Sequence, residues 1–235
     1  MIKQISKILN SDKLENSISY EFKNKNLLKE ALTHRSYLNE NPKWHLPHNE
    51  RLEFLGDAVL ELVVTEYLYK KYDKPEGELT NWRASLVNAE MLGDLAYELG
   101  IDRFIMVSRG EHRDNGKARH YILADALEAI IGAMYLDQGY EKCQNFITKY
   151  LLIKLSGIIK NKLYRDSKSL FQEASQDKLS ITPSYYVLRE WGPDHAKRFE
   201  IGLFLEEEQI AIGEGSSKQE AEQDAAKKGL VVKGW

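Results

Sequence analysis

Two segments of this 235-residue chain place carboxylates at helical spacing among apolar residues. In the first, residues 49–68, the side chains of Glu50, Glu53 and Asp57 fall within about 60° of one another on a helix. Aliphatic residues and Phe54 fill most other positions, which predicts a helix buried on nearly all sides. Buried carboxylates repel one another and lose their hydration, so cations must neutralise them. Lysine side chains or metal ions could do so.

The second segment, residues 122–136, carries Asp125 and Glu128 three positions apart on an otherwise apolar helix. Packed against the first helix, it would bring five carboxylates together, and Glu76 in the loop that leaves the first helix could add a sixth. Each set also has a plainer interpretation, as a solvated helix face or as salt-bridge partners. The two helices together favour a metal site.

Carboxylate oxygens select hard cations, so Mg²⁺ is expected, with Mn²⁺ as a substitute, rather than Zn²⁺. The absence of clustered Cys and His residues agrees with that choice. Two such ions suit in-line displacement at a phosphodiester, where one activates water and the other stabilises the leaving oxygen. No organic cofactor is expected.

Composition limits the cell compartment and the mode of nucleic-acid binding. The net charge is -3, and residues 167–235 hold 9 basic and 12 acidic side chains, while residues 1–166 balance at 24 of each. A global basic field for nucleic acid is therefore disfavoured.

A single cysteine, Cys143, fits a reducing compartment. With no leader and no long apolar run, we expect a cytoplasmic protein that does not enter a membrane.

Periodicity and breakers predict two domains. The fold class expected is multidomain: an all-α domain at residues 1–159, a short polar linker at 160–166, and a small α+β (α-β-β-β-α) domain at 167–235. Helices are predicted at 1–40, 49–68, 79–99, 122–136, 170–176 and 217–230, strands at 184–191, 199–205 and 209–213, and loops at 42–47 and 109–119.

The run Asn49-Glu50-Arg51-Leu52-Glu53-Phe54-Leu55-Gly56-Asp57-Ala58-Val59-Leu60 closely resembles the signature of ribonuclease III, the bacterial double-stranded RNA endonuclease family. Further matches lie at 31–36, 76–79, 83–87 and 122–132, and segments at 170–173, 192–195 and 213–218 resemble a double-stranded RNA-binding domain. The resemblance implies an Mg²⁺-dependent endoribonuclease that leaves 5′-phosphate and 3′-hydroxyl ends with short 3′ overhangs, working in rRNA, mRNA or small-RNA processing.

The resemblance also implies roles for individual residues. Metal ligands would be Glu53, Asp57, Asp125 and Glu128, of which Asp57 and Glu128 are also catalytic, assisted by Glu50 and Glu76. Glu61 matches no functional position. Phe54 would insert into the partner subunit of a homodimer, although core packing is its plainer interpretation. Contacts to double-stranded RNA would come from Ser169, Gln172, Glu173 and Gln176 on one helix, His195 in a turn, and Ser217 and Lys218 at the next helix start.

One departure from the family and two alternatives stay open. Gln219 follows Lys218 where the family often has another basic residue, and Glu220 and Glu222 come next, so weaker phosphate binding is expected. The main alternative is a regulator that binds double-stranded RNA without cutting it. An acidic helical dimerisation module with a structural metal is the other, but it leaves residues 167–235 unexplained. The 42–47 loop around Trp44 has no assigned role.

Overall fold

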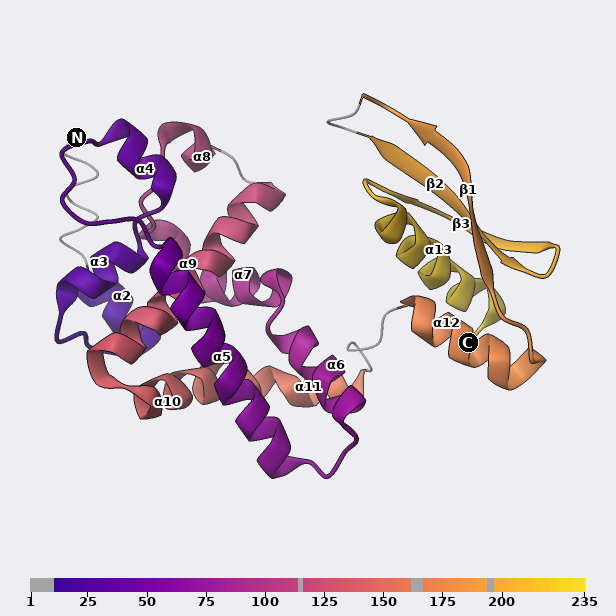
Figure 1. Ribbon diagram of the computed structural model, residues 1–235, viewed down its shortest axis with the longest axis horizontal. Coiled ribbons are helices and arrows are strands. Elements are labelled where there is room, and N and C mark those ends of the chain that lie inside the picture. Colours follow the sequence, from indigo (N-terminus) through magenta and orange to yellow (C-terminus); the bar gives the residue numbers. More distant parts are fainter. Residues whose placement is uncertain (1–10, 114–115, 162–166, 194–196) are drawn as a thin grey trace. The chain divides into compact units, whose positions relative to one another are not determined.

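The computed structural model describes residues 11–113, 116–161, 167–193 and 197–235 (Figure 1). It divides into two compact units, Met1–Asn161 and Lys162–Trp235. The linker boundary predicted at 160–166 stays a prediction, because residues 162–166 lie outside the described part of the chain.

The first unit is built from helices, which confirms the predicted all-α class for this part of the chain. Their bounds are α2 Ser11–Ile18, α3 Lys25–Ala31, α4 Arg35–Glu40, α5 Glu50–Lys71, α6 Glu76–Leu86, α7 Ala89–Glu98, η1 Ile101–Arg103, α8 Arg109–Arg113, α9 Lys117–Gln138, α10 Tyr140–Tyr150, η2 Leu152–Lys154 and α11 Leu155–Lys160. None of these described helices is long and apolar enough to cross a bilayer.

One prediction of helix bounds and one prediction of element type were wrong in this unit. The single helix expected at 79–99 is two helices, α6 and α7, because the side chain of Asn88 accepts the Met91 N–H and caps a new helix start. The exposed loop expected at 109–119 instead contains α8 and the first turn of α9. Polar composition signals exposure, and a polar segment on the surface can still be helical.

The two longest described helices of the unit, α5 and α9, pack against each other (Figure 1). Residues 129–131 of α9 are almost fully buried, as are Leu60, Val63 and Val64 of α5. Helix α7 packs on α9 as well. The pair of helices that carries the carboxylates is therefore also the core of the unit.

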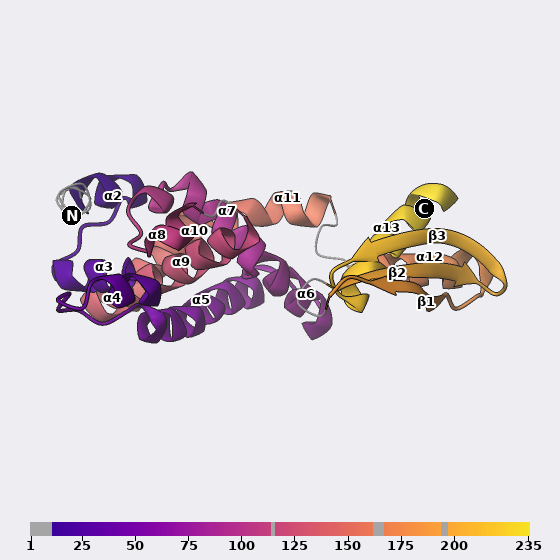
Figure 2. The same cartoon turned by 90° about the horizontal axis from the view of Figure 1, so that it is seen from above.

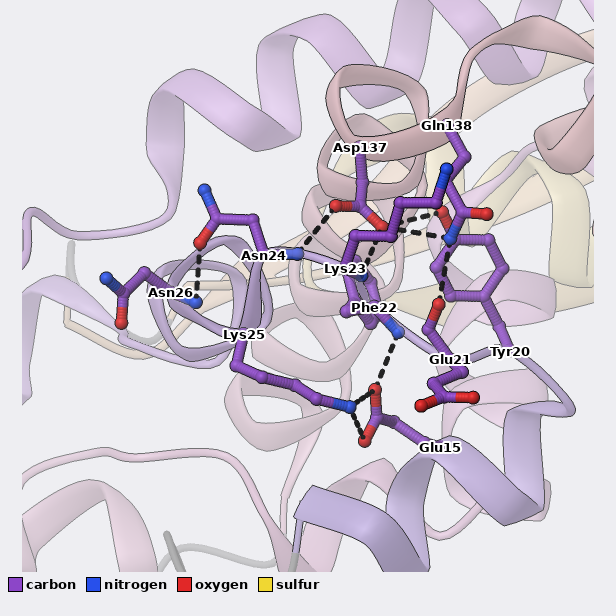
Figure 3. Close-up of polar contacts among 10 residues, drawn as sticks. All are labelled: Glu15, Tyr20, Glu21, Phe22, Lys23, Asn24, Lys25, Asn26, Asp137 and Gln138. Atoms are coloured by element: carbon purple, nitrogen blue, oxygen red, sulfur yellow. Dashed lines mark hydrogen bonds and ion pairs between the residues drawn. The ribbon is translucent and has the colours of Figure 1, made fainter.

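A polar network fixes the C-terminal end of α9 (Figure 3). The carboxylate of Asp137 accepts the backbone N–H groups of Lys23 and Asn24, at 2.9 and 2.8 Å. Nearby, Glu15 accepts the Phe22 N–H at 2.7 Å and forms a 2.6 Å ion pair with Lys25. These bonds hold the turn between α2 and α3 and tie it to the end of α9.

The second unit has the predicted α-β-β-β-α order (Figure 2). Its elements are α12 Ser167–Leu179, β1 Ser184–Trp191, β2 Arg198–Leu205, β3 Glu208–Gly215 and α13 Lys218–Lys233. The strands form an antiparallel sheet in the order β1-β2-β3. Phe171 of α12 and Ala225 of α13 share one buried cluster with Leu203 and Ile210 of the sheet, so both helices cover the same sheet face.

Candidate metal centre

Two glycines set the closest approach of α5 and α9. A Cβ atom placed on Gly56 would lie 1.8 Å from the Glu128 carbonyl oxygen, and one placed on Gly132 would lie 2.1 Å from the Leu52 carbonyl oxygen. Any larger side chain would separate the helices, since both obstacles are backbone atoms. The crossing lies within one turn of Glu53 on α5 and within one turn of Glu128 on α9. The glycines thus bring the two acidic segments together.

Three carboxylates meet beside this crossing. One oxygen each from Glu53, Asp125 and Glu128 lies within 4.8 Å of the others, and all three residues are half-buried. Burial, followed by the charges of Asp125, Glu50 and Asp57, raises the pKa of Glu53 to about 7. Burial and the charges of Asp57, Asp125, Glu53 and Glu61 raise the pKa of Glu128 to about 8. The pKa of Asp125 is also raised, first by burial and then by the charge of Glu50.

Glu50 and Asp57 lie within electrostatic reach of this cluster but outside the group of three. Both residues are exposed. Glu61, expected to have no functional role, also acts on Glu128, though as the weakest of the named charges. The predicted convergence of five carboxylates therefore has a compact part, Glu53 with Asp125 and Glu128, and an open edge toward solvent.

Sequence reasoning missed two neighbours of Glu50, a guanidinium group and an imidazole ring. The guanidinium of Arg35 lies 3.6 Å from one oxygen of Glu50, and Nδ1 of His48 lies 3.8 Å from the other. Arg35 approaches because the Asn49 N–H donates to the Thr33 carbonyl at 2.9 Å, which places the start of α4 beside the start of α5, whereas His48 is two residues before Glu50 in the chain. A basic residue in the 33–36 segment was the available signal, but only the fold shows its proximity to Glu50.

Glu76 does not join the cluster within one subunit. It lies at the start of α6, where it lines a pocket of about 430 Å³ together with Thr65 and Tyr69 of α5. Tyr69 follows Glu53 by 16 residues, which is about 24 Å along a helix. The sixth carboxylate expected in one centre is thus at the far end of α5, a correction to the sequence-based arrangement.

The prediction that residues 49–68 are buried on nearly all sides was wrong. Phe54 is 81% exposed, Leu62 is 57% exposed, and Tyr69 near the helix end is 79% exposed. These three side chains fall within about 80° on α5, so they form one apolar strip that no described element of the subunit covers. An uncovered apolar strip of this length on a folded domain indicates an interaction surface.

In the second unit, the polar positions suggested for RNA contact occupy one exposed face of α12. Ser169, Gln172, Glu173 and Gln176 recur at helical spacing on that face, while Phe171 points into the core. Ser217 is the N-cap of α13, where its hydroxyl oxygen accepts the Glu220 N–H at 3.1 Å, and Lys218 is the first helical residue. His195 lies outside the described residues.

The donor set of the centre fits a hard divalent cation. Its three members offer only carboxylate oxygens, which suit Mg²⁺ or Mn²⁺. The upward pKa shifts come first from burial and then from the neighbouring carboxylate charges, so full ionisation of the cluster calls for a compensating positive charge. A bound cation would supply that compensation and keep the carboxylates ionised at neutral pH.

Comparisons with known proteins agree with the division of the chain into two units. A family model described as Ribonuclease-III-like matches residues 24–155, and one described as double-stranded RNA binding motif matches residues 167–231. The chain is 45% identical over 222 residues to Ribonuclease 3 of a Nitratiruptor species, covering 94% of this chain and 96% of that protein. It is 43% identical to Ribonuclease 3 of Carboxydothermus hydrogenoformans, covering 93% and 94% respectively.

A solved structure is similar to the first unit. The nuclease domain of ribonuclease III from Campylobacter jejuni, described as having a flexible region involved in dimer formation, shares 47% sequence identity with this chain. The match has a TM-score of 0.54 and covers 59% of this chain and 93% of that one.

Proposed function

The chain belongs to the ribonuclease III family and is an endoribonuclease, and we propose that it hydrolyses double-stranded RNA with Mg²⁺, leaving 5′-phosphate and 3′-hydroxyl ends. The observation that carries the metal dependence is the cluster of Glu53, Asp125 and Glu128 at the α5–α9 crossing. Three carboxylate oxygens so close together are compensated at neutral pH either by bound protons or by a bound cation.

In this proposal Glu53, Asp125 and Glu128 hold the metal, with Asp57 at the exposed edge of the same centre. Bound Mg²⁺ supplies Lewis acidity, by which water is activated and charge on the leaving oxygen is stabilised. The protein contributes placement, because α5 and α9 are fixed against each other by glycines. Glu50, paired with Arg35 and His48, lies on the solvent side, where a phosphate strand could approach.

We further propose that two copies of the chain associate through the exposed strip of α5. Phe54 is the most exposed aromatic residue on that strip, and the pocket beside Tyr69 and Glu76 lies at its other end. In a two-fold dimer, each Phe54 can enter the partner's pocket. Because Glu53 precedes Phe54, that insertion would bring Glu76 of one subunit toward the acidic cluster of the other. This arrangement gives Glu76 a role beside a metal centre that it does not reach in its own subunit.

The second unit supports the choice of substrate. A-form RNA displays 2′-hydroxyl groups in a wide minor groove and phosphates on either side of it. The exposed polar face of α12 suits the hydroxyl groups, and the N-terminus of α13 with Lys218 suits a phosphate. Both units therefore fit the same proposed substrate class, double-stranded RNA.

The proposal is tested by incubating labelled duplex RNA and Mg²⁺ with the wild-type protein, Glu128→Ala and Glu61→Gln. Removal of a direct metal ligand should slow cleavage at least about 100-fold, since even groups that only support a ligand give losses approaching that size. Asp57→Ala should also slow cleavage. Glu61→Gln, on the same helix as Asp57, should cleave like wild type.

The outcomes separate the alternatives. Duplex binding by all proteins with cleavage by none would instead support the non-cleaving regulator. Equal cleavage by wild type and Glu128→Ala would reject the assignment of the metal centre.

A further inference from the structure

Two lysines in the second unit converge on one carboxylate. The ammonium group of Lys197 lies 2.8 Å from one oxygen of Glu190, and that of Lys218 lies 3.5 Å from the other. Both ammonium groups also lie over the ring of Phe199, at 5.5 and 5.7 Å from its centroid. Lys197 precedes β2, and Lys218 opens α13, so residues 21 positions apart in sequence form one cationic group.

The sheet register fixes this arrangement. Glu190 of β1 pairs directly with Phe199 of β2, so the carboxylate and the ring are cross-strand neighbours. Ser217 caps the adjacent helix start and sets the position of Lys218. Lys218 therefore comes from a capped helix start, and Lys197 directly precedes Arg198, the first residue of β2, which pairs with Trp191 of β1.

The chemistry of the pair suits a phosphodiester group. The carboxylate of Glu190 already presents two oxygens to the two ammonium groups, and a backbone phosphate also presents two unshared oxygens. The Lys218 ammonium has three N–H donors, more than contact with one carboxylate oxygen requires. The positive end of the α13 dipole adds to the attraction for an anion at this place.

Other lysines of the unit are arranged differently. Lys168 pairs with Glu222 at 2.6 Å, Lys228 with Asp224 at 2.7 Å, and Lys233 with Glu208 at 3.3 Å. In each of these pairs one lysine faces a carboxylate of its own. At Glu190, by contrast, one carboxylate pairs with the ammonium groups of two lysines.

We propose that Lys197 is a further RNA-binding residue and acts with Lys218 as a two-lysine clamp on a backbone phosphate of the duplex. Glu190 is the positioning residue of this clamp, because it holds the two ammonium groups together against their mutual repulsion. The inference rests on the proposed function in that it takes double-stranded RNA as the ligand. It adds a residue that the family resemblance does not assign, and it explains how the unit can bind phosphate although Lys218 is followed by Gln219.

The test measures duplex RNA binding by the full-length Glu128→Ala protein carrying Lys197→Ala, Lys218→Ala, or both, across a salt series. The control is Lys227→Ala, because residue 227 lies nine positions after Lys218 and so faces the opposite side of α13. Lys197→Ala should weaken binding about fivefold, as expected for an exposed ion contact. It should also reduce the magnitude of the slope of log affinity against log salt by about 0.9.

Clamp behaviour is tested by the double variant. If both lysines hold one phosphate, the fold-loss of RNA affinity in the double variant should be smaller than the product of the fold-losses in the two single variants. With Glu190→Gln added, the two losses should become independent. Equal binding by Lys197→Ala and Lys227→Ala, with unchanged melting temperatures, would overturn the clamp. Failure of the parent protein to bind duplex at all would count against the proposed function rather than against Lys197.

Discussion

Glu128 shows how much of the centre follows from residue types and spacing alone. The i, i+3 spacing of Asp125 and Glu128, and the separate stripe containing Glu53, led to an expected joint site, and the structure places these three together. The roles of individual ligands stay predictions. The contact of Arg35 with Glu50 could not be predicted, because it depends on a backbone bond between Thr33 and Asn49.

The raised pKa values predict that the metal-free protein loses stability as pH rises. Glu53 and Glu128 have pKa values of about 7 and 8 when folded, against an ordinary value of 4.5. Between these limits the folded state binds more protons than the unfolded state, so the free energy of unfolding falls with increasing pH. With EDTA present, the melting temperature should be lower at about pH 8.5 than at about pH 6. These two pH values lie above and below the pKa values of both glutamates. Mg²⁺ should restore more stability at the higher pH, since fewer protons must leave the carboxyl groups when the ion binds.

Glu128→Gln is the variant that isolates this effect, because it removes the most strongly shifted group. The difference between the two pH values should shrink in this variant and persist in Glu61→Gln. The comparison is needed because burial lowers the pKa of His34, which changes stability in the opposite direction. A Glu128→Gln protein with the full wild-type pH dependence would contradict the prediction.

At the level of elements, the crossing of α5 and α9 decides whether the carboxylates meet. Apolar periodicity and breakers located both helices and the three strands, but helix ends were less predictable, as α6 and α7 show. The closeness of the crossing was also unpredictable from periodicity. Gly56 and Gly132 have no pattern that identifies them as contact points until both helices are placed. These two positions require glycine because backbone atoms of the opposite helix lie where a Cβ atom would be.

Gly56→Ala should therefore destabilise the first unit. The new methyl group would overlap the Glu128 carbonyl, a backbone obstacle that cannot rotate away. Overpacking of this kind costs about 1–3 kcal/mol, and the helices should separate enough to weaken metal binding. Chemical denaturation and Mn²⁺ titration measure the two effects. Gly157→Ala in α11, where an added Cβ meets nothing within 4 Å, is the matched control and should not destabilise. Equal stability of the two variants would refute the role of the crossing.

The whole molecule raises a question that one subunit cannot answer, namely why Glu76 resembles a functional position yet lies at the far end of α5. Insertion of Phe54 into the partner's pocket would resolve it by pairing Glu76 of one subunit with the cluster of the other. Apolar periodicity alone could not reach this arrangement, because it predicted that α5 is buried on nearly all sides. Only the family resemblance suggested that Phe54 inserts into a partner subunit. The strip is visible only once the subunit core is complete and Phe54 stays outside it.

A mixed dimer tests this arrangement directly. One subunit carries Glu128→Ala and the other Glu76→Ala, each with a different affinity tag for purification, and single-strand nicking of duplex RNA is measured with Mg²⁺. If Glu76 acts across the interface, both substitutions fall in one centre and the other centre is intact, so about half of the wild-type nicking rate should remain. If Glu76 acts in its own subunit, each centre carries one defect and activity should fall to the level of the two parent homodimers. Phe54→Glu should prevent assembly of either dimer in sedimentation experiments, because it would place a charge in an apolar contact.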